Sequence, residues 1–484
     1  MDTGLSRSHF DVHGEAPCRP SSQRDRTSYQ RGAACFQSGR IWRFSPIRLS
    51  IAIKVMLASV TEKGEKGLKM VPQGQLEAIS FRQLRLFESV GRLESVRRAS
   101  EDCNLSQPAV TQSLSKLEQL VGAQLVERRA SGSYLNASGQ LFYRRVARFI
   151  GQFEQALAQF GVEGGMAGAK LVSARLLRSQ VRVLIAIVEH GSFALAAQSL
   201  DLSPATLQRA ARDLESNLRK PLFYRGAAGT MLLPDGAELG RRLKLSLQEV
   251  DLAAQELAVL QGGATTPIVV GAMPLGGSVL LASMLDDFIA AAPQAQVVVR
   301  SESAVEMLKT LRAGDVDFVV GLLPRESAED LEAIALAHTP YSIVAREGHP
   351  LLRQEKVTRD DLGRFDWLVG AVGSSRRDCF DHLFAGHPEV RAPIATSALA
   401  MIRPLMIGSD RLTLMTSYEL QHEGQGLAAI PFGPIAPVPV IGVTSRANWL
   451  PTRLHADFLQ MLRDHVDMVM DSPLKPPLAQ GAFA

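Results

Sequence analysis

A long internal repeat restricts the fold of this chain more than any other feature. The segment LSQPAVTQSLSKLEQLVGAQLVERR, which begins at Leu105, returns 97 residues later as LSPATLQRAARDLESNLRKPLFYRG. The two copies align without gaps, and the matched residues are caps, apolar residues and glycines. The matched pairs include Gln83 and Gln180, Ser95 and Ser192, Ser106 and Ser203, Glu118 and Glu215, and Gly139 and Gly236. Because caps, apolar residues and glycines all match, the repeat predicts one fold unit that occurs twice.

Each copy is predicted to contain three helices, a short hairpin and a long helix. In the first copy, apolar residues at i, i+3 spacing predict a helix that begins at Phe81, and a shorter helix covers about 95–103. Ser106 is the predicted N-cap of the third helix, and Pro108 is tolerated in its first turn because the N–H groups there lack intrahelical partners. Two extended runs follow at 125–136. The predicted apolar face of the third helix consists of Val110, Leu114, Leu117 and Val121.

Long amphipathic helices are predicted at 138–160 and 235–260. Their apolar residues recur every three to four positions and form stripes like those of coiled coils. Two such stripes cannot both face water without making an association-prone patch, so we expect at least one of them to pair with another subunit. The glycine-rich segment 161–174 is predicted to be a flexible linker.

From Ile268 onward the pattern changes to alternating strands and helices. Runs such as PIVVGAM and VDFVVGLL are short and rich in β-branched residues, and helical segments separate them. Repeated βα units of this length predict parallel sheets in an α/β domain, with a last helix at about 452–470.

Basic residues concentrate on the repeat. Residues 81–260 hold 23 Lys and Arg against 17 Asp and Glu, although the whole chain carries only +4. That balance favours a polyanionic partner for the repeated part. No apolar run reaches the roughly 18–20 residues of a membrane span, so a cytoplasmic protein without membrane contact is expected. The four cysteines lie far apart, which predicts reduced thiols; they are Cys18, Cys35, Cys103 and Cys379.

Enzyme motifs are missing from the sequence. It contains no GxSxG, GxxxxGK[ST], HExxH or EF-hand spacing, and its ten histidines form no cluster. The sequence therefore predicts neither catalysis nor a metal or cofactor.

The helical part of each copy has the signature of a winged helix-turn-helix. Its third helix suits the major groove of DNA, and arginines of the hairpin suit phosphates. Glutamine can pair bidentately with adenine, so the polar residues of that helix are candidates for reading bases. The alternative for any one of them is a solvated helix face. The candidate DNA-binding residues are Gln107, Pro108, Thr111, Gln112, Ser115, Lys116, Arg128 and Arg129 in the first copy, and Gln208, Arg209, Arg212 and Arg225 in the second.

These motifs resemble a known family. The segments LSQPAVTQSLSKLEQLVGAQLVERR…LNASG and GSFALAAQSLDLSPATLQRAARDLESNLRKPLFYR are similar to the DNA-binding domain of LysR-type transcriptional regulators. The resemblance covers about 81–470. It implies a dimerising linker helix and a C-terminal effector domain like a type 2 periplasmic binding protein. The segments GAMPLGGSVLL, YSIVAREGHPL and IGVTSRANWLPT resemble the GbpR-type branch more narrowly.

The chain departs from that family in having two DNA-binding units. The first keeps the start of the recognition helix but has Val96 where the second has Phe193. The second keeps the supporting helix but has Pro204 where the first has Gln107. Which unit reads bases therefore stays open, and the repeat is interpreted as a duplicated and diverged DNA-reading head.

The resemblance implies a small-molecule site between two α/β subdomains. Loops after strands and helix N-termini would converge on that crevice. For each serine and threonine, the alternative is that it only caps a helix N-terminus. Arg376 and Arg377 either hold an acidic ligand or form a solvated pair. The candidate effector-binding residues are Met273, Pro274, Leu275, Ser278, Ser301, Ser303, Ser374, Ser375, Arg376, Thr396 and Thr416.

The predicted fold is multidomain, α and α/β. It comprises two tandem winged helix-turn-helix domains with long linker helices and a two-subdomain domain like a type 2 periplasmic binding protein. The expected boundaries are 1–77 disordered, 78–160 first unit, 161–174 linker, 175–261 second unit, 266–472 effector domain and 473–484 disordered tail. Translation is expected to start later than Met1, at Met56 or Met70.

The predicted function is promoter control in response to an effector, either sugar-derived or an organic acid. The expected partners are double-stranded promoter DNA, RNA polymerase and further copies of the chain in a homodimer or homotetramer. The alternative is a ligand-binding receptor whose winged-helix units contact proteins rather than DNA.

Overall fold

The structure is a computed structural model that describes residues 76–129, 132–226, 229–262, 267–273, 276–323, 328–396 and 398–469. The predicted disordered tail and nearly all of the predicted N-terminal extension lie outside these ranges. Leu76, however, is buried together with Ile79 against the first helical unit. The extension predicted for 1–77 therefore ends earlier than expected.

The first helical unit begins at Phe81. Its elements are α3 (Phe81–Leu93), α4 (Val96–Asp102), α5 (Gln107–Val121), β1 (Val126–Arg129), β2 (Gly132–Leu135) and α6 (Ala137–Gln159). Ser106 accepts a hydrogen bond from the Ala109 N–H, which confirms the predicted N-cap. Val110, Leu114, Leu117 and Val121 are buried as the apolar spacing predicts.

The second helical unit repeats this element order. It comprises α8 (Arg178–His190), α9 (Phe193–Ser199), α10 (Pro204–Leu218), β3 (Phe223–Gly226), β4 (Gly229–Leu232) and α11 (Pro234–Leu260). Its recognition-type helix again begins after a serine, because Ser203 accepts a hydrogen bond from the Thr206 N–H. The predicted long helices are both confirmed as α-helical.

The flexible linker predicted between the units is wrong. Residues Gly165–Arg175 form a helix, α7, which begins after Gly164 in the left-handed conformation. Ala169 and Ser173 of α7 are fully buried, and α7 packs on α6. The glycines of this segment are weak helix formers, but burial against α6 outweighs their low propensity.

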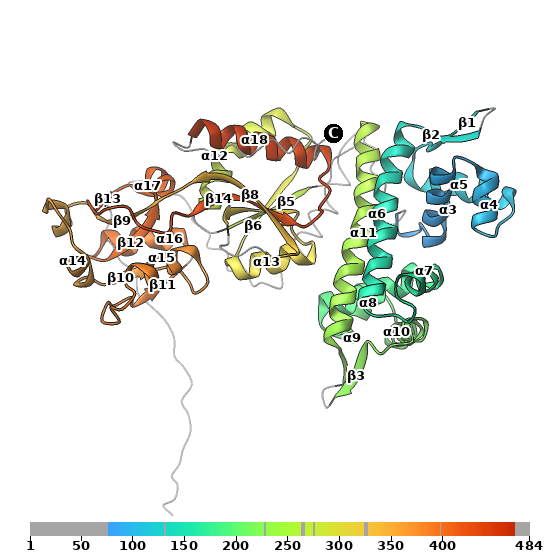
Figure 1. Cartoon of the computed structure of the whole chain (residues 1–484), viewed down its shortest axis with the longest axis horizontal. Coiled ribbons are helices and arrows are strands. Elements are labelled where there is room, and N and C mark those ends of the chain that lie inside the picture. Colours follow the sequence, from blue (N-terminus) through green and yellow to red (C-terminus); the bar gives the residue numbers. More distant parts are fainter. Residues whose placement is uncertain are drawn as a thin grey trace, which may run out of the picture. The chain divides into compact units, whose positions relative to one another are not determined.

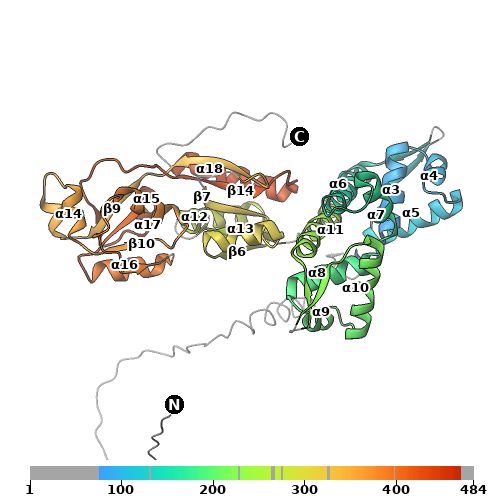
Figure 2. The ribbon, with the colours of Figure 1, turned by 60° about the horizontal axis from the view of Figure 1, so that its bottom comes forward.

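The two long helices pack against each other within the chain (Figure 1; Figure 2). Their apolar residues share one core cluster, which includes Phe142, Val146, Leu239 and Leu243. Much of each apolar stripe is therefore covered by the other long helix within the chain, while pairing with another subunit stays a prediction. Sequence periodicity showed an apolar face on each helix but not which surface covers it.

A five-stranded sheet forms the first half of the α/β region. Its order is β6 (Val297–Ser301), β5 (Ile268–Ala272), β7 (Phe318–Leu322), β14 (Val440–Arg446) and β8 (Leu331–His338). Val320 faces the core formed with α12 (Gly276–Ala291) and α18 (Arg453–Val469), while the neighbouring Val319 faces α13 (Ala304–Ala313). This alternation places helices on both faces of the sheet.

The second sheet has the order β11 (Ile394–Ala395), β10 (Trp367–Val369), β12 (Leu412–Thr416), β9 (Tyr341–Arg346) and β13 (Leu427–Ala429). The 3₁₀ helix η1 (Pro350–Arg353), α14 (Arg359–Gly363), α15 (Ser375–Leu383), α16 (Leu399–Ile407) and α17 (Ser417–Glu423) surround it. Trp367 packs on α15, and the adjacent Leu368 packs on α16.

Both sheets are mixed, which corrects the prediction of parallel sheets. β5 pairs in parallel with β6 and β7, but β14 runs antiparallel to β7 and β8. In the second sheet, β9 runs antiparallel to both β12 and β13. Such strands join a sheet without a right-handed βα crossover, and strand-helix alternation alone does not reveal them.

No single helix in the described part of the chain is long and apolar enough to cross a membrane. Among those residues α8 and α9 pass a composition test only when taken together, and the chain bends by 120° between them. Their apolar residues Val183, Ile187 and Ala196 are buried in the core of the second unit.

Asp317 links β7 to the last helix. Its carboxylate accepts a hydrogen bond from the Val269 N–H at 2.7 Å and lies 3.2 Å from Nε2 of His455. Burial acts to raise the pKa of Asp317, but the hydrogen bond and charge of His455 outweigh burial and hold that pKa below its usual value. A depressed pKa stabilises the fold above the unfolded pKa of about 4, and this stabilisation is lost as pH falls through the folded pKa.

We therefore expect Asp317→Asn to lower the free energy of unfolding by about 1–3 kcal/mol at neutral pH. The difference from the unsubstituted protein should shrink as pH falls from about 4 through the lowered folded pKa of Asp317, because position 317 then becomes uncharged in both proteins. Urea denaturation at neutral and acidic pH measures both effects. Asp467→Asn on the exposed face of α18 is the matched control, and an equal loss in both variants would contradict the assigned role.

Candidate functional site

The outward face of α5 carries the predicted base-reading residues of the first unit. Gln107, Pro108, Gln112, Ser115 and Lys116 are exposed, and Thr111 is half-buried. The opposite face holds the buried leucines and valines already described. The helix therefore presents polar side chains from its N-terminal turn outward, as a helix that enters a DNA groove does.

The outward face of α10 is more basic. Gln208, Arg209 and Arg212 are exposed, and Leu207, Ala211 and Leu214 are buried beneath them. Arg212 donates to the Gln208 carbonyl at 3.3 Å, which keeps its guanidinium along the helix. Guanidinium groups in this position suit phosphate contact and can also pair with guanine in the major groove.

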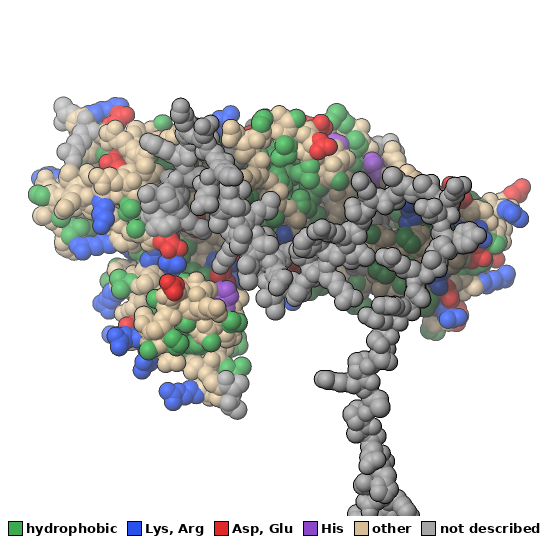
Figure 3. Space-filling model, turned by 180° about the vertical axis from the view of Figure 1, so that it is seen from behind, with side chains coloured by type: hydrophobic (Ala, Val, Ile, Leu, Met, Phe, Trp, Pro, Cys, Tyr) green, Lys and Arg blue, Asp and Glu red, His purple; other side chains and the backbone are tan. Residues whose placement is uncertain are grey.

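The hairpin arginines lie beside these helices. Arg129 is exposed, pairs with Glu127 at 3.1 Å and lies over the Tyr134 ring. Arg225 is also exposed, on a strand that pairs with β4. Nothing is described for the side chain of Arg128. Exposed pairs such as Arg129 with Glu127 are weak, so Arg129 can exchange its partner for a phosphate. Figure 3 shows Lys and Arg side chains on the outer edge of the helical units, at the left of the view.

One glutamate in each unit holds the hairpin against the recognition-type helix. Glu118 accepts hydrogen bonds from the N–H groups of Leu125 and Val126 at 2.8 and 3.1 Å. Glu215 accepts the equivalent pair from Leu222 and Phe223 at 2.7 and 3.1 Å. No role was predicted from the sequence for Glu118 or Glu215. Their identity in both copies, beside polar positions that diverged, is the signal that could have found this positioning role.

The first group of predicted effector residues lies at one edge of the first sheet. Ala272 and Ser301 are register partners on parallel strands, so Met273 and Ser303 follow neighbouring strand ends. Met273 is buried, and Ser278 donates to its carbonyl at 3.5 Å. Ser301 and Ser303 are exposed, and Ser303 caps α13. Pro274 and Leu275 lie outside the described residues.

The second group lies at the carboxyl ends of β10, β11 and β12, which run parallel. Ser374 caps α15 and Thr416 caps α17, so the N-capping alternative describes both. Ser375 and Thr396 are half-buried. A Cβ placed on Gly373 would lie 3.8 Å from Cγ2 of Val305, at the start of α13. The two groups of loops therefore approach each other there.

Arg376 and Arg377 are not a solvated pair, because each has a carboxylate partner in the structure. Arg376 is 2% exposed, and its Nη2 lies 2.7 Å from Oε2 of the fully buried Glu419. Its Nε and Nη1 have no hydrogen-bond partner among the described residues. Burial raises the pKa of the neighbouring Tyr341 to about 12, which keeps that phenol protonated at neutral pH. Arg377 instead pairs with Asp381 along α15.

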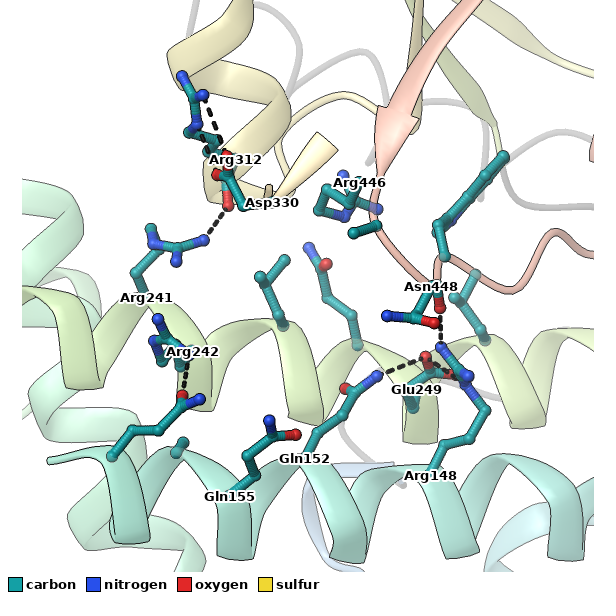
Figure 4. Close-up of a pocket in the computed structure, with 17 residues that line it drawn as sticks. Arg148, Gln152, Gln155, Arg241, Arg242, Glu249, Arg312, Asp330, Arg446 and Asn448 are labelled. Carbon is teal, nitrogen blue, oxygen red and sulfur yellow. Dashed lines mark hydrogen bonds and ion pairs between the residues drawn. The ribbon is translucent and has the colours of Figure 1, made fainter. Parts of the chain in front are cut away.

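A cavity of about 250 Å³ lies away from these loops (Figure 4). It is lined by α6, α11 and residues of the first sheet, and no predicted effector residue lines it. Five arginines surround it: Arg148, Arg241, Arg242, Arg312 and Arg446. Each already has a protein partner; for example, Arg312 pairs with Asp330 at 2.7 Å and Arg446 donates to the Val316 carbonyl. The cavity is therefore not an anion site by charge alone.

Family models match three segments that together cover more than half of the chain. The LysR substrate binding domain matches residues 261–467. The bacterial regulatory helix-turn-helix protein, lysR family, matches twice, at 81–140 and 179–237. The chain therefore belongs to the LysR family of DNA-binding transcription regulators with an effector-binding domain.

Two relatives place the chain within that family. The HTH-type transcriptional regulator GalR of Pseudomonas putida is 31% identical over 381 residues, which cover 78% of this chain and 94% of the relative. GbpR of Rhizobium radiobacter is 28% identical over 212 residues, or 43% of this chain and 70% of the relative. The first alignment is long enough that it must include α5 and α10.

Solved structures of LysR-type regulators are more distant. A full-length variant of OxyR from Pseudomonas aeruginosa has 19% identity and a TM-score of 0.45, covering 62% of this chain and 98% of that one. Full-length CbnR complexed with target DNA has 18% identity and a TM-score of 0.36, covering 60% and 99%. The family assignment rests on the family models and on the GalR relative.

Proposed function

We propose that both helical units are winged helix-turn-helix domains that bind promoter DNA. The observation that carries this is the same arrangement in both units. In each, a serine-capped helix exposes polar and basic residues, and a glutamate holds the hairpin against it. The surplus of basic residues in 81–260 supports a polyanionic partner.

A mobility-shift assay tests this function with the full chain and a duplex from upstream of its own coding sequence. A scrambled duplex of equal length and composition is the competitor. Retention that resists the scrambled competitor at about 0.15 M salt supports specific DNA binding. Equal competition by the scrambled duplex and by unlabelled upstream duplex would show non-specific DNA binding only. No retention at any salt concentration would favour a receptor whose helical units contact proteins.

We propose further that a small effector, sugar-derived or an organic acid, binds where the two groups of loops approach each other. The support is the convergence of strand ends and the short separation between Gly373 and Val305. Tyr341 and the Arg376 donors that lack a partner within the described ranges lie in the second sheet domain, which provides half of this site. Ser301 is the exposed member of the first group that terminates its strand.

Ser301→Ala is expected to weaken binding of the effector by about 0.5–1.5 kcal/mol, or about 2–10-fold, through loss of one hydrogen bond. The fold should change little because the side chain is exposed. Thermal shift with a panel of monosaccharides and small carboxylic acids identifies a binding probe, and calorimetry measures its affinity. Ser216→Ala on the exposed face of α10 is the control. Unchanged affinity in Ser301→Ala would move the site elsewhere.

A further inference from the structure

The long helices of the two units are related by a two-fold arrangement inside one chain. Arg145 of α6 pairs with Glu256 of α11 at 3.0 Å, and Arg242 of α11 donates to the Gln159 side chain of α6. In the alignment of the two copies, which are 97 residues apart, Arg242 is equivalent to Arg145 and Glu256 is equivalent to Gln159. The two contacts are therefore equivalent: the same pair of positions meets once from each unit. Such an interface is isologous.

The axis of this arrangement passes between Gln152 and Glu249. These residues are themselves equivalent at the offset of 97, and Nε2 of Gln152 lies 3.3 Å from Oε1 of Glu249. A residue that contacts its own equivalent must lie beside the axis. The contacts of Arg145 and Arg242 on opposite sides of it show that α6 and α11 run antiparallel.

The C-terminal ends of α6 and α11 also make matching contacts with the other unit. Gln261, directly after α11, donates to the Gly122 carbonyl at the end of α5, at 3.0 Å. Lys220, two residues after the end of α10, donates to the Phe160 carbonyl at the end of α6, also at 3.0 Å. Each long helix thus ends against the recognition-type helix of the other unit. The first head, both long helices and parts of α8 and α10 share one core, beside which the second head has a smaller core of its own.

We infer that a single chain places two unlike recognition helices on one DNA duplex, and so reads a bipartite site whose halves differ in sequence. This inference rests on the proposed function. A two-fold axis preserves direction along itself, so both heads present the same face to the same side. The 23 residues of α6 span about 35 Å, close to the 34–36 Å of one turn of B-DNA.

The halves of the site differ because the two helices differ. The exposed residues near the start of α5 are Gln107 and Gln112, which suit base edges. The matching part of α10 has Pro204 and Arg209. Two identical subunits related by a true two-fold axis would favour a palindrome. The duplicated chain instead gives the site a fixed polarity.

Cross-linking tests whether the helices pair within one chain. A double variant, Gln159→Cys with Arg242→Cys, is treated with a short bismaleimide, and peptides that join positions 159 and 242 are identified by mass spectrometry. The control is co-expression of the two single variants, in which that peptide requires two chains. We expect the joined peptide in the double variant, migrating as a monomer, and not in the co-expressed pair. A joined peptide from the co-expressed pair, or none in either, overturns the pairing.

Selection from a random-sequence duplex library with the full chain then tests the bipartite site. We expect two unlike elements, one altered by Gln107→Ala and the other by Arg209→Ala. Two identical inverted elements would overturn the inference while leaving DNA binding intact. No enrichment over the input library would instead contradict the proposed function, and the cross-linking result would still decide how the helices pair.

Discussion

Replacing Arg145 with methionine should lower the free energy of unfolding by about 3–5 kcal/mol. Arg145 is 1% exposed, and its guanidinium lies 2.9 Å from Glu249 and 3.0 Å from Glu256. It also donates to the carbonyls of Leu450 and Pro451. Methionine keeps the aliphatic volume but removes the cation of Glu256 and one of the two arginines beside the buried Glu249, which keeps Arg148 at 3.0 Å. The charge of these two carboxylates that is no longer compensated accounts for most of the loss.

Arg242→Met is the matched control because Arg242 occupies the equivalent position in the second unit. Its side chain is 38% exposed and pairs with the half-exposed Glu238. A pair of this kind contributes about 0–1 kcal/mol, so the control should change stability by no more than that. Urea denaturation followed by circular dichroism gives both values. Equal losses in the two variants would show that burial at the helix pair does not distinguish the two arginines.

The helical units could be predicted from local sequence signals. Serine caps at Ser106 and Ser203 and the apolar spacing of α5 and α10 are short-range features, and the structure confirms them. α7 could not be predicted, because its glycines favour a linker and only burial against α6 makes it helical. The antiparallel strands β9 and β14 were missed because strand direction depends on partners that lie far away in the chain.

The candidate sites show the same division. The exposed face of α5 follows from helical periodicity, so its residues could be placed without a structure. The burial of Arg376 and its ion pair could not be predicted, because its partner Glu419 lies 43 residues away on another helix. The pairing of α6 with α11 was missed for a related reason. An amphipathic stripe predicts burial but does not say whether the partner is the same chain or another.

Losing Gln107 should relax base preference at one half of the DNA site. Gln107→Ala is expected to cost about 1–3 kcal/mol on the preferred duplex and much less on a scrambled one, because a glutamine amide can pair bidentately with adenine. Gln119→Ala is the matched control, since Gln119 is an exposed glutamine at the other end of α5.

Arg225→Ala should behave differently, because the exposed Arg225 lies on the hairpin of the second unit, where it suits a phosphate. Losing one phosphate contact should weaken binding to all duplexes alike and lower the slope of log K against log salt by about one unit. Binding curves across a salt series on preferred and scrambled duplexes separate the two behaviours, since only Gln107→Ala should reduce the ratio of the two affinities. The reverse result, in which Arg225→Ala reduces that ratio and Gln107→Ala changes only the salt slope, would show that the roles assigned to Gln107 and Arg225 are exchanged.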